Sequence, residues 1–217
     1  MSLSIALTKG RLEKTTVDML KECGYGVDGV IHKNRELVIA DTVKDIRYFL
    51  VKSNDCITYV EHGVADVGIV GKDTLMEGGK DYYEMLDLEC GKCRFVVAGL
   101  KDKNPLHKVG HITIGTKYPK ITQEYFQKKG LDAEIIKIDG SVELSPLLGL
   151  CDGIVDITET GTTLRENGLV IYDTVAEVSA RVIVNKVSFK MKKKEVMQLL
   201  QDLERIVQKN ASRNQSE

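Results

Sequence analysis

The sequence predicts an α/β protein with two lobes, each built on a mostly parallel sheet. Short apolar runs alternate with helical patterns along the chain, as in strands joined by covering helices. One such pattern occurs twice, at residues 62–75 and 148–164. At 217 residues the chain is long enough for one large or two small domains with their own cores.

The elements follow in order. We predict strands where short apolar runs are bounded by polar or glycine residues: residues 3–7, 35–40, 66–70, 93–100, 111–116, 133–138, 153–157 and 180–186. We predict helices where apolar residues recur at helical spacing and a glycine or a new strand follows: residues 11–24, 55–63, 121–130, a segment ending at Leu148, and 163–168. From Lys192 onward, six apolar residues keep helical spacing and predict one amphipathic closing helix: Val196, Leu199, Leu200, Leu203, Ile206 and Val207.

The repeated pattern matches Gly63 with Gly149 and Asp66 with Asp152. Both copies have the order glycine, small residue, aspartate, buried strand, polar loop. Two αβ units can look alike without a common origin, so a true internal repeat and a chance likeness both remain open. Ligands of open α/β sheets bind beyond the carboxyl ends of the strands, so we expect the two polar loops to border a cleft.

The composition narrows the function classes. The chain has 31 basic and 32 acidic residues and a net charge of −1, so no overall field favours nucleic acid or an anionic membrane as a partner. The amino terminus has no signal-peptide pattern, and no apolar run reaches about eighteen residues, so we expect a cytoplasmic protein. Five cysteines are an odd number, which favours free thiols, and we interpret the C-x-x-C formed by Cys90 and Cys93 as structural or incidental.

The segment at residues 158–163, "TETGTT", follows a buried strand and opens a predicted helix. Consecutive backbone N–H groups, three threonine hydroxyls, the helix dipole and Gly161 would together form a cradle for an anion. Asp156 and Glu143 would repel a phosphate but suit the vicinal hydroxyls of a ribose. These features predict a sugar phosphate site. The alternative is that threonine and glycine only cap a helix here.

The segment "ELSPLLGLCDGIVDITETGTTL", residues 143–164, resembles the signature of the ATP phosphoribosyltransferase family. So do "ALTKGRL", "YVEHGVADVGIVGKD", "GTKYPKITQEYF" and "SARVIVN", and the resemblance runs in order from residue 3 to about residue 190. It implies the short form of the family, with a fold similar to type II periplasmic binding proteins and an active site in the interlobe cleft. The implied lobes are residues 1–92 plus 183–217, on the side of the nucleotide and pyrophosphate, and residues 93–182, which bind the phosphoribosyl group.

The resemblance also implies a reaction. The phosphoribosyl group passes from phosphoribosyl pyrophosphate to N1 of ATP, giving N1-(5-phosphoribosyl)-ATP and pyrophosphate with Mg²⁺ as cofactor, in the first step of histidine biosynthesis. Short-form enzymes pair with a regulatory subunit similar to histidyl-tRNA synthetase. We therefore expect a homodimer of this chain alone, a hetero-octamer with that subunit, and no nucleic-acid or membrane partner.

The family's site residues are carried over position by position. The implied catalytic residues are Arg11 and Arg35, whose guanidinium groups suit the charge that develops on pyrophosphate. The implied ATP and pyrophosphate residues are Lys9, Gly10, Arg11, Gly71, Lys72 and Asp73. The implied phosphoribosyl pyrophosphate residues are Glu143, Asp156, Thr158, Glu159, Thr160, Gly161, Thr162 and Thr163. No residue is assigned as a metal ligand.

Each assignment has a plainer alternative. Arg11 and Arg35 could be surface charges, Lys9 an ordinary loop lysine and Asp73 a helix cap. No histidine is assigned a catalytic role, because N1 of adenine carries no proton before it attacks. The chain has "KSND" from Lys52 where many members have Arg-Pro-Ser-Asp, so a bidentate phosphate contact there is in doubt.

Two other functions fit the two-lobe pattern. One is a binding module, either a solute-binding protein or the sensing half of a regulator, which would need a signal peptide or a DNA-binding helix pair that the sequence does not show. The other is a phosphoribosyltransferase of the nucleotide-salvage type, whose loop carries two adjacent acids. Here only Asp156 stands at the strand end. A requirement for ATP that a free purine base cannot replace would separate the two enzymes.

Overall fold

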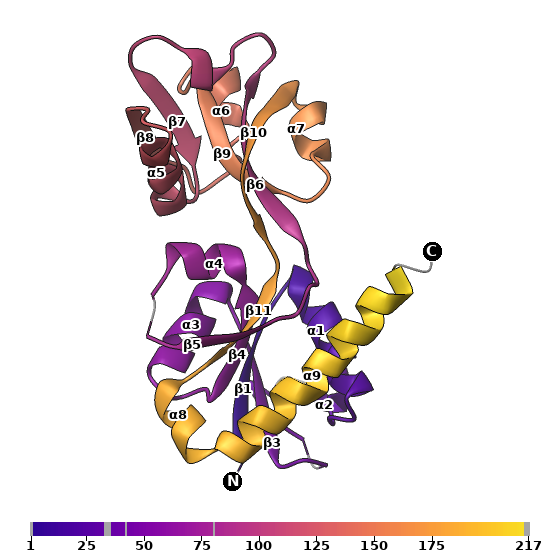
Figure 1. Ribbon diagram of the computed structural model, residues 1–217. Coiled ribbons are helices and arrows are strands. Elements are labelled where there is room, and N and C mark those ends of the chain that lie inside the picture. Colours follow the sequence, from indigo (N-terminus) through magenta and orange to yellow (C-terminus); the bar gives the residue numbers. More distant parts are fainter. Residues whose placement is uncertain (1, 33–35, 42, 80, 215–217) are drawn as a thin grey trace. The chain divides into compact units, whose positions relative to one another are not determined.

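The chain divides into two units, drawn in Figure 1. The computed structural model describes residues 2–32, 36–41, 43–79 and 81–214. Unit 1 comprises residues 1–91 and 179–217, and unit 2 comprises residues 92–178. The predicted second boundary, 182/183, would cut through strand β11 (Ala180–Val184), which pairs with other strands of unit 1 along its length. The crossing between units therefore precedes this strand.

Unit 1 is one sheet with helices packed against it. Its strands lie in the order β2-β3-β1-β4-β11-β5 among the described residues. Their bounds are β1 (Leu3–Thr8), β2 (Val38–Asp41), β3 (Ile46–Val51), β4 (Val67–Gly71) and β5 (Tyr83–Asp87), with β11 as above. The helices are α1 (Arg11–Glu22), α2 (Asp28–His32), α3 (Ser53–Glu61), α4 (Lys72–Glu77), α8 (Lys186–Met191) and α9 (Lys193–Asn214).

Unit 2 has the same kind of construction. Its described strands lie in the order β10-β6-β9-β7-β8. They are β6 (Cys93–Leu100), β7 (Ile112–Thr116), β8 (Ala133–Lys137), β9 (Gly153–Thr158) and β10 (Leu169–Val178). The helices are a short 3₁₀ turn at Pro105–His107, α5 (Pro119–Lys128), α6 (Leu144–Leu147) and α7 (Thr162–Glu166).

The α/β class with two sheets is confirmed, but the prediction of mostly parallel sheets is wrong. In unit 1, β1 is parallel to β3 and β4, whereas β2 is antiparallel to β3 and β11 is antiparallel to both β4 and β5. In unit 2, β7 is parallel to β8 and β9, whereas β6 is antiparallel to β9 and β10. The short connection from β2 to β3 permits only a hairpin, so these two strands are antiparallel.

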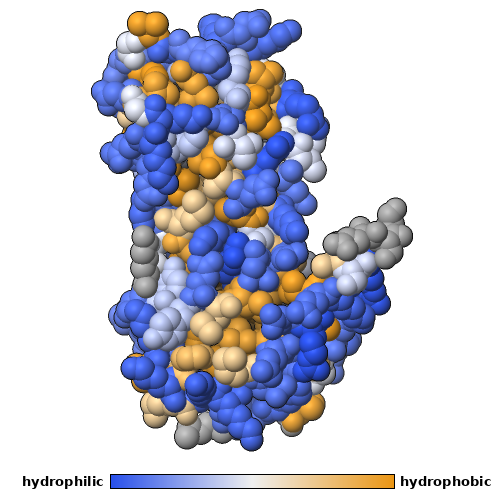
Figure 2. Space-filling model, in the orientation of Figure 1, coloured by the Kyte–Doolittle hydropathy of each residue, from blue (hydrophilic) through white to orange (hydrophobic). Residues whose placement is uncertain are grey.

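The buried residues explain why these elements form. All six apolar residues of the predicted closing helix are buried in α9, and they pack with buried residues of α1, β1, β4 and β11 in one apolar cluster of unit 1. In unit 2 a smaller cluster of Val96, Ala98, Ile154, Leu164 and Leu169 lies on one face of the sheet. Hydrophilic residues cover most of the visible surface of both units, and apolar residues emerge between them in several places (Figure 2). This pattern does not mark a ligand site, which must be found from geometry.

Candidate functional site

The threonine-rich segment follows β9 directly, as predicted, and is ordered by its own hydrogen bonds. The N–H of Gly161 donates to Oγ of Thr158 at 2.8 Å, and the hydroxyls of Thr160 and Thr162 lie 2.9 Å apart. Gly161 has a φ of 74°, in the left-handed region that favours glycine. The helix that follows, α7, spans only five residues, so its dipole contributes less to an anion site than the sequence suggested. The hydroxyls and N–H groups remain the principal donors of this loop.

Arg165, which the sequence analysis did not assign, braces this loop. Its Nη1 donates to the carbonyl oxygen of Thr160 at 2.9 Å and its Nη2 to Oγ of Thr162 at 3.0 Å. The guanidinium therefore spans the turn and holds two of its residues in a defined position. The signal was present in the sequence, because an arginine three residues beyond Thr162 lies on the same side of a helix.

The two predicted ribose acids lie close enough to interact. Asp156 is half-buried near the end of β9, and Glu143 is the N-cap residue of α6. Burial raises the pKa of Asp156 above its ordinary value, and the charge of Glu143 raises it further, while the N–H of Ile157 and the charge of Lys117 lower it. A pair of carboxylates arranged in this way favours a ligand that donates hydrogen bonds or carries positive charge.

The corresponding edge of unit 1 carries cations. Because β1, β3 and β4 are parallel, their carboxyl ends meet at one edge of the sheet. Lys9 follows β1, Lys52 follows β3 and Lys72 follows β4. The N–H of Lys9 donates to the carbonyl oxygen of Val51 at 2.9 Å, which places the first two lysines on neighbouring segments. Three strands thus each contribute a lysine to one edge.

Arg11 and Asp73, both assigned from the resemblance, also lie near each other. Nη1 of Arg11 donates to the carbonyl oxygen of Gly91 at 3.1 Å, so this arginine connects the start of α1 with the end of unit 1's first segment. Burial raises the pKa of Asp73, whereas backbone hydrogen bonding at Thr74 and at Asp73 itself and the charge of Arg11 lower it. The alternative reading of Asp73 as the helix N-cap is wrong, because Asp73 is the second residue of α4 and the N-cap is Gly71.

The other unit 1 residues are placed as follows. Nζ of Lys72 lies 2.6 Å from a carboxylate oxygen of Glu84, so its ammonium already has a partner. Gly10 precedes α1 with a φ of 98° and borders a groove of about 710 Å³, to which Val17, Val30 and Ile31 contribute apolar side chains. Arg35 lies outside the described residues.

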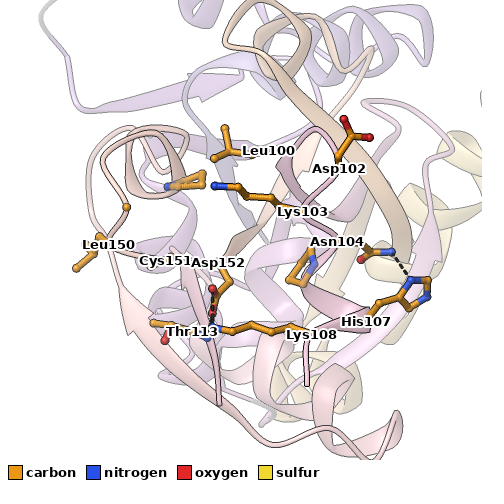
Figure 3. A pocket seen from close by; sticks show the side chains of 13 residues that line it. Leu100, Asp102, Lys103, Asn104, His107, Lys108, Thr113, Leu150, Cys151 and Asp152 are labelled. Atoms are coloured by element: carbon orange, nitrogen blue, oxygen red, sulfur yellow. Dashed lines mark hydrogen bonds and ion pairs between the residues drawn. The ribbon is translucent and has the colours of Figure 1, made fainter. Parts of the chain in front are cut away.

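A larger pocket of unit 2, of about 810 Å³, is drawn in Figure 3. Thr113 and Asp152, which line it, lie at the amino ends of β7 and β9, whereas the threonine loop lies at the carboxyl end of β9. Two charged groups of the pocket, Lys108 and Asp152, form an ion pair. Nζ of Lys108 donates to both carboxylate oxygens of Asp152 at 2.7 Å, and the N–H of Thr113 donates to one of them at 2.8 Å. Burial raises the pKa of Asp152, but the bonds from Lys108 and Thr113 outweigh it, and the pKa is lowered overall. This pocket contains none of the predicted site residues.

The cysteines, the possible metal ligands and the helices were each compared with what a disulfide, a metal site and a membrane span require. Cys23, Cys56, Cys90, Cys93 and Cys151 are all free thiols, and burial raises the pKa of Cys90. Within the described residues, no group of three or more His, Cys, Asp and Glu side chains is placed to hold a metal ion. None of the described helices combines the length and the apolar character needed to cross a membrane.

Comparisons with known proteins now identify relatives. The family model for ATP phosphoribosyltransferase matches residues 52–205. A protein of that name from Clostridium kluyveri is 54% identical over 198 residues, covering 91% of this chain and 90% of the relative. One from Clostridium acetobutylicum is 50% identical and covers 97% and 98%, respectively. One from Listeria monocytogenes serotype 4b is 52% identical and covers 95% and 96%.

Solved structures agree in fold. A chain of the ATP phosphoribosyl transferase (HisG:HisZ) complex from Thermotoga maritima matches with a TM-score of 0.79 and 39% identity, covering 95% of this chain and 98% of that one. The periplasmic aliphatic sulphonate binding protein SsuA from Escherichia coli matches with a TM-score of 0.63, covering 99% and 75%, but is only 9% identical. The second likeness concerns the fold alone and bears out the predicted similarity to periplasmic binding proteins.

Proposed function

The chain belongs to the ATP phosphoribosyltransferase family, and from this premise we propose that its two units divide the work of binding. As a member, it transfers the phosphoribosyl group of phosphoribosyl pyrophosphate to N1 of ATP, the first step of histidine biosynthesis. Unit 2 binds the sugar phosphate, and unit 1 binds ATP and the departing pyrophosphate. The observation that carries this division is chemical. Asp156 and a hydroxyl-rich loop lie at the end of β9, with Glu143 near Asp156 at the start of α6, whereas lysines follow β1, β3 and β4.

In unit 2, the loop residues Thr158, Glu159, Thr160, Gly161, Thr162 and Thr163 bind the 5′-phosphate, and Glu143 and Asp156 accept hydrogen bonds from the ribose hydroxyls. The mutual repulsion of the two acids supports this role, since a bound diol donates to both carboxylates. The hydroxyls of Thr160 and Thr162, which bond to each other here, turn toward phosphate oxygens when the anion binds. Arg165 keeps the turn in place while they do so.

In unit 1, Lys9, Gly10, Arg11, Gly71, Lys72 and Asp73 bind ATP and pyrophosphate. As the lone pair of N1 attacks C1 of the ribose, the bond from C1 to the pyrophosphate oxygen breaks and negative charge grows on the leaving group. Cations placed at that charge lower the barrier, which is the role we assign to Arg11 and Arg35. The ion pair between Lys72 and Glu84 is part-exposed and worth only about 0.2–1 kcal/mol, so a phosphate can replace Glu84 as its partner.

Magnesium is the proposed cofactor. Mg²⁺ keeps several waters and is usually held by one or two carboxylates together with substrate phosphates. The pair Glu143 and Asp156 fits that requirement, because it offers two interacting carboxylates beside the proposed ribose site. When bound, the ion would neutralise charge on the pyrophosphate. Glu143 and Asp156 would hold the ribose in the orientation in which C1 faces the attacking N1 of ATP.

We also propose that the chain works in the cytoplasm with a regulatory partner similar to histidyl-tRNA synthetase, as a homodimer alone and as a hetero-octamer with that partner. The matched structure from Thermotoga maritima is itself a complex of two named components, HisG and HisZ. Which surface of this chain such a partner would cover is a separate question from the reaction.

A coupled assay tests the proposal. The purified chain is mixed with ATP, phosphoribosyl pyrophosphate and magnesium, with and without the synthetase-like subunit, and phosphoribosyl-ATP is followed by its absorbance. We expect product only with ATP, no product with free adenine, and a higher rate with the subunit. Product from adenine would instead indicate the salvage type of phosphoribosyltransferase. Full activity without the subunit would contradict the proposed regulation but not the reaction.

A further inference from the structure

One segment of the family resemblance, "SARVIVN", has no role in the site so far. It covers β11, where Ala180 pairs with Gly71 at the carboxyl end of β4. The N–H of Lys72 donates to the carbonyl oxygen of Ser179 at 2.9 Å, so the backbone of this lysine is fixed beside the segment. The one charged side chain of the segment is Arg181, which therefore lies at the edge of unit 1 that carries the lysines.

Arg181 lies between two carboxylates of β5. Its Nη2 is 2.7 Å from a carboxylate oxygen of Asp87, and its Nη1 is 3.6 Å from a carboxylate oxygen of Glu84. The register of β5 against β11 skips one residue between Glu84 and Leu86. In a regular strand, acids three residues apart would point to opposite faces of the sheet. The irregularity explains how both acids reach one guanidinium.

The two acids are held differently. Asp87 also accepts from the hydroxyl of Ser179 at 2.7 Å, so it is fixed from two sides. Glu84 has Nζ of Lys72 at 2.6 Å as its close partner, and its 3.6 Å to Arg181 is longer than a hydrogen bond. Within the part of the chain that the structure describes, Nε of Arg181 is buried and has no hydrogen-bond partner. The guanidinium therefore has unused donors beside a carboxylate that another cation holds.

On this geometry, and resting on the proposed function, we propose that Arg181 is a positioning residue for ATP, which pairs with Glu84 in place of Lys72 when the lysine turns to a phosphate of the nucleotide. A phosphate that draws Lys72 away leaves Glu84 without its close partner, and the bare carboxylate attracts the lysine back. Closing the 3.6 Å gap to hydrogen-bond distance gives Glu84 a new partner. The backbone of Lys72 stays bound to Ser179 while its side chain moves.

The proposal makes Glu84 a competitor of the substrate for Lys72, and Arg181 sets how strongly it competes. Without the arginine, Glu84 depends on Lys72 and holds it against the nucleotide. Arg181→Met therefore raises the KM for ATP about three- to fivefold, the effect of one part-exposed ion pair. The kcat and the KM for phosphoribosyl pyrophosphate stay within about twofold of the wild type, because Arg181 contacts neither substrate.

The coupled assay described above measures these constants. The synthetase-like subunit and magnesium chloride are present, and each substrate is varied at a saturating concentration of the other. Arg181→Lys keeps a cation beside the two acids, so its KM for ATP lies between those of the wild type and Arg181→Met.

A second substitution tests the mechanism directly. Glu84→Gln removes the charge that competes for Lys72, so in the Arg181→Met background it returns the KM for ATP to within about twofold of the wild type. Alone, Glu84→Gln leaves that KM unchanged or lowers it. A glutamine on β5 does not repair a strand whose packing is lost, so this rescue distinguishes a positioning role from a merely structural one.

Arg205→Met is the matched control. Arg205 is paired with Asp202 on α9, a helix that carries none of the proposed site residues. Its loss removes an arginine ion pair of unit 1 and leaves the KM for ATP unchanged. A wild-type KM for ATP in Arg181→Met would overturn the proposal. A raised KM that Glu84→Gln does not restore would overturn it as well, and would indicate that Arg181 contacts the nucleotide itself.

Lys72→Met separates this inference from the assignment of the site. We expect that variant to raise the KM for ATP at least about tenfold, since it removes a charged partner of a phosphate. If its KM for ATP equals that of the wild type, Lys72 is wrongly assigned to the nucleotide. If Lys72→Met raises the KM while Arg181→Met does not, only the role of Arg181 fails.

Discussion

The parallel strand pairs β1–β4 in unit 1 and β7–β9 in unit 2 are built alike at their amino ends. In unit 1, the N–H of Asp66 donates to the carbonyl oxygen of Ser4 at 2.9 Å, and the N–H of Ser4 donates back to the Asp66 carboxylate at 2.8 Å. In unit 2, Asp152 and Thr113 exchange the same two bonds, both at 2.8 Å. This equivalence supports the internal repeat that the sequence left open.

The glycine of the repeated pattern agrees as well. Gly63 and Gly149 both have positive φ, 69° and 75°, three residues before the respective aspartates. Each turn therefore reverses the chain through the left-handed region before the strand begins. At the amino ends of these strands, the repeated sequence pattern therefore adopts the same local structure in both units.

The surroundings of the two aspartates differ. Asp66 is buried, and its carboxylate also accepts from the hydroxyl of Ser188 at 2.6 Å and from Nζ of Lys192 at 2.7 Å, on elements that follow β11. The Asp152 side chain is 28% exposed and, besides the N–H of Thr113, accepts from Nζ of Lys108 at the edge of a pocket. The same motif thus anchors the carboxyl-terminal helices in unit 1 but only a surface loop in unit 2.

The largest effect predicted from this difference is that of Asp66→Asn. The substitution leaves the Lys192 ammonium, with 21% of its side chain exposed, without its carboxylate, and breaking a buried pair costs about 3 kcal/mol of unfolding free energy. Urea denaturation followed by circular dichroism measures the change. Hydrogen exchange shows where it acts, and β1, β4 and α9 should lose protection while unit 2 keeps it.

The control for this prediction is Lys192→Met. It removes the partner charge but leaves the bonds of Asp66 to Ser4 and Ser188, so it also destabilises unit 1, by a smaller amount. Equal and small losses in both variants, below about 1 kcal/mol, would show that the pair behaves as a surface ion pair.

The carboxyl ends of the same strands supply the second contrast. β4 runs directly into α4 at Lys72, whereas β9 continues into a loop held by Arg165. Arg165→Met removes both braces, and the loop must then be ordered by the substrate. We expect the KM for phosphoribosyl pyrophosphate to rise about tenfold with little change in the KM for ATP. Steady-state kinetics with each substrate varied in turn measures both constants.

Arg165→Lys sharpens the second prediction. A lysine keeps the charge but cannot span Thr160 and Thr162 with one rigid fork, so it should rescue only part of the loss. Complete rescue would show that the charge matters rather than the brace. A fall in kcat with an unchanged KM would show that the loop acts in the transition state alone.

The sequence predicted those parts of the fold that local pattern determines. The strands β1, β4, β6 and β9 and the buried stripe of α9 all follow from apolar spacing. The strands β3, β5 and β10 were missed. β5 carries Glu84 and Asp87 within its five residues, which interrupts its apolar pattern. β10 begins with the apolar run at residues 169–172, a local signal that could have predicted it.

The candidate site was predictable to a similar degree. The threonine loop does lie at the end of a buried strand, as its sequence indicated, and its role in binding stays a prediction. The partner of Lys72 was not predictable, since Glu84 lies on the missed strand β5. Strand direction was not predictable either, because nothing within β11 shows that it will lie between β4 and β5 and run opposite to β4.

The smallest expected effect belongs to Asp152→Asn, the counterpart of the first prediction. Its pair with Lys108 is part-exposed and worth about 0.2–1 kcal/mol. The pKa of Asp152 is lowered in the folded chain, so its contribution is present above the unfolded pKa of about 4 and is lost as the pH falls through the lower folded value. The difference in unfolding free energy between wild type and variant should therefore be constant from pH 8 to pH 6 and shrink toward zero near pH 3. If that difference instead equals the effect of Asp66→Asn, the burial of the two aspartates would not explain their different roles, and the contrast between the units would have to come from the strands themselves.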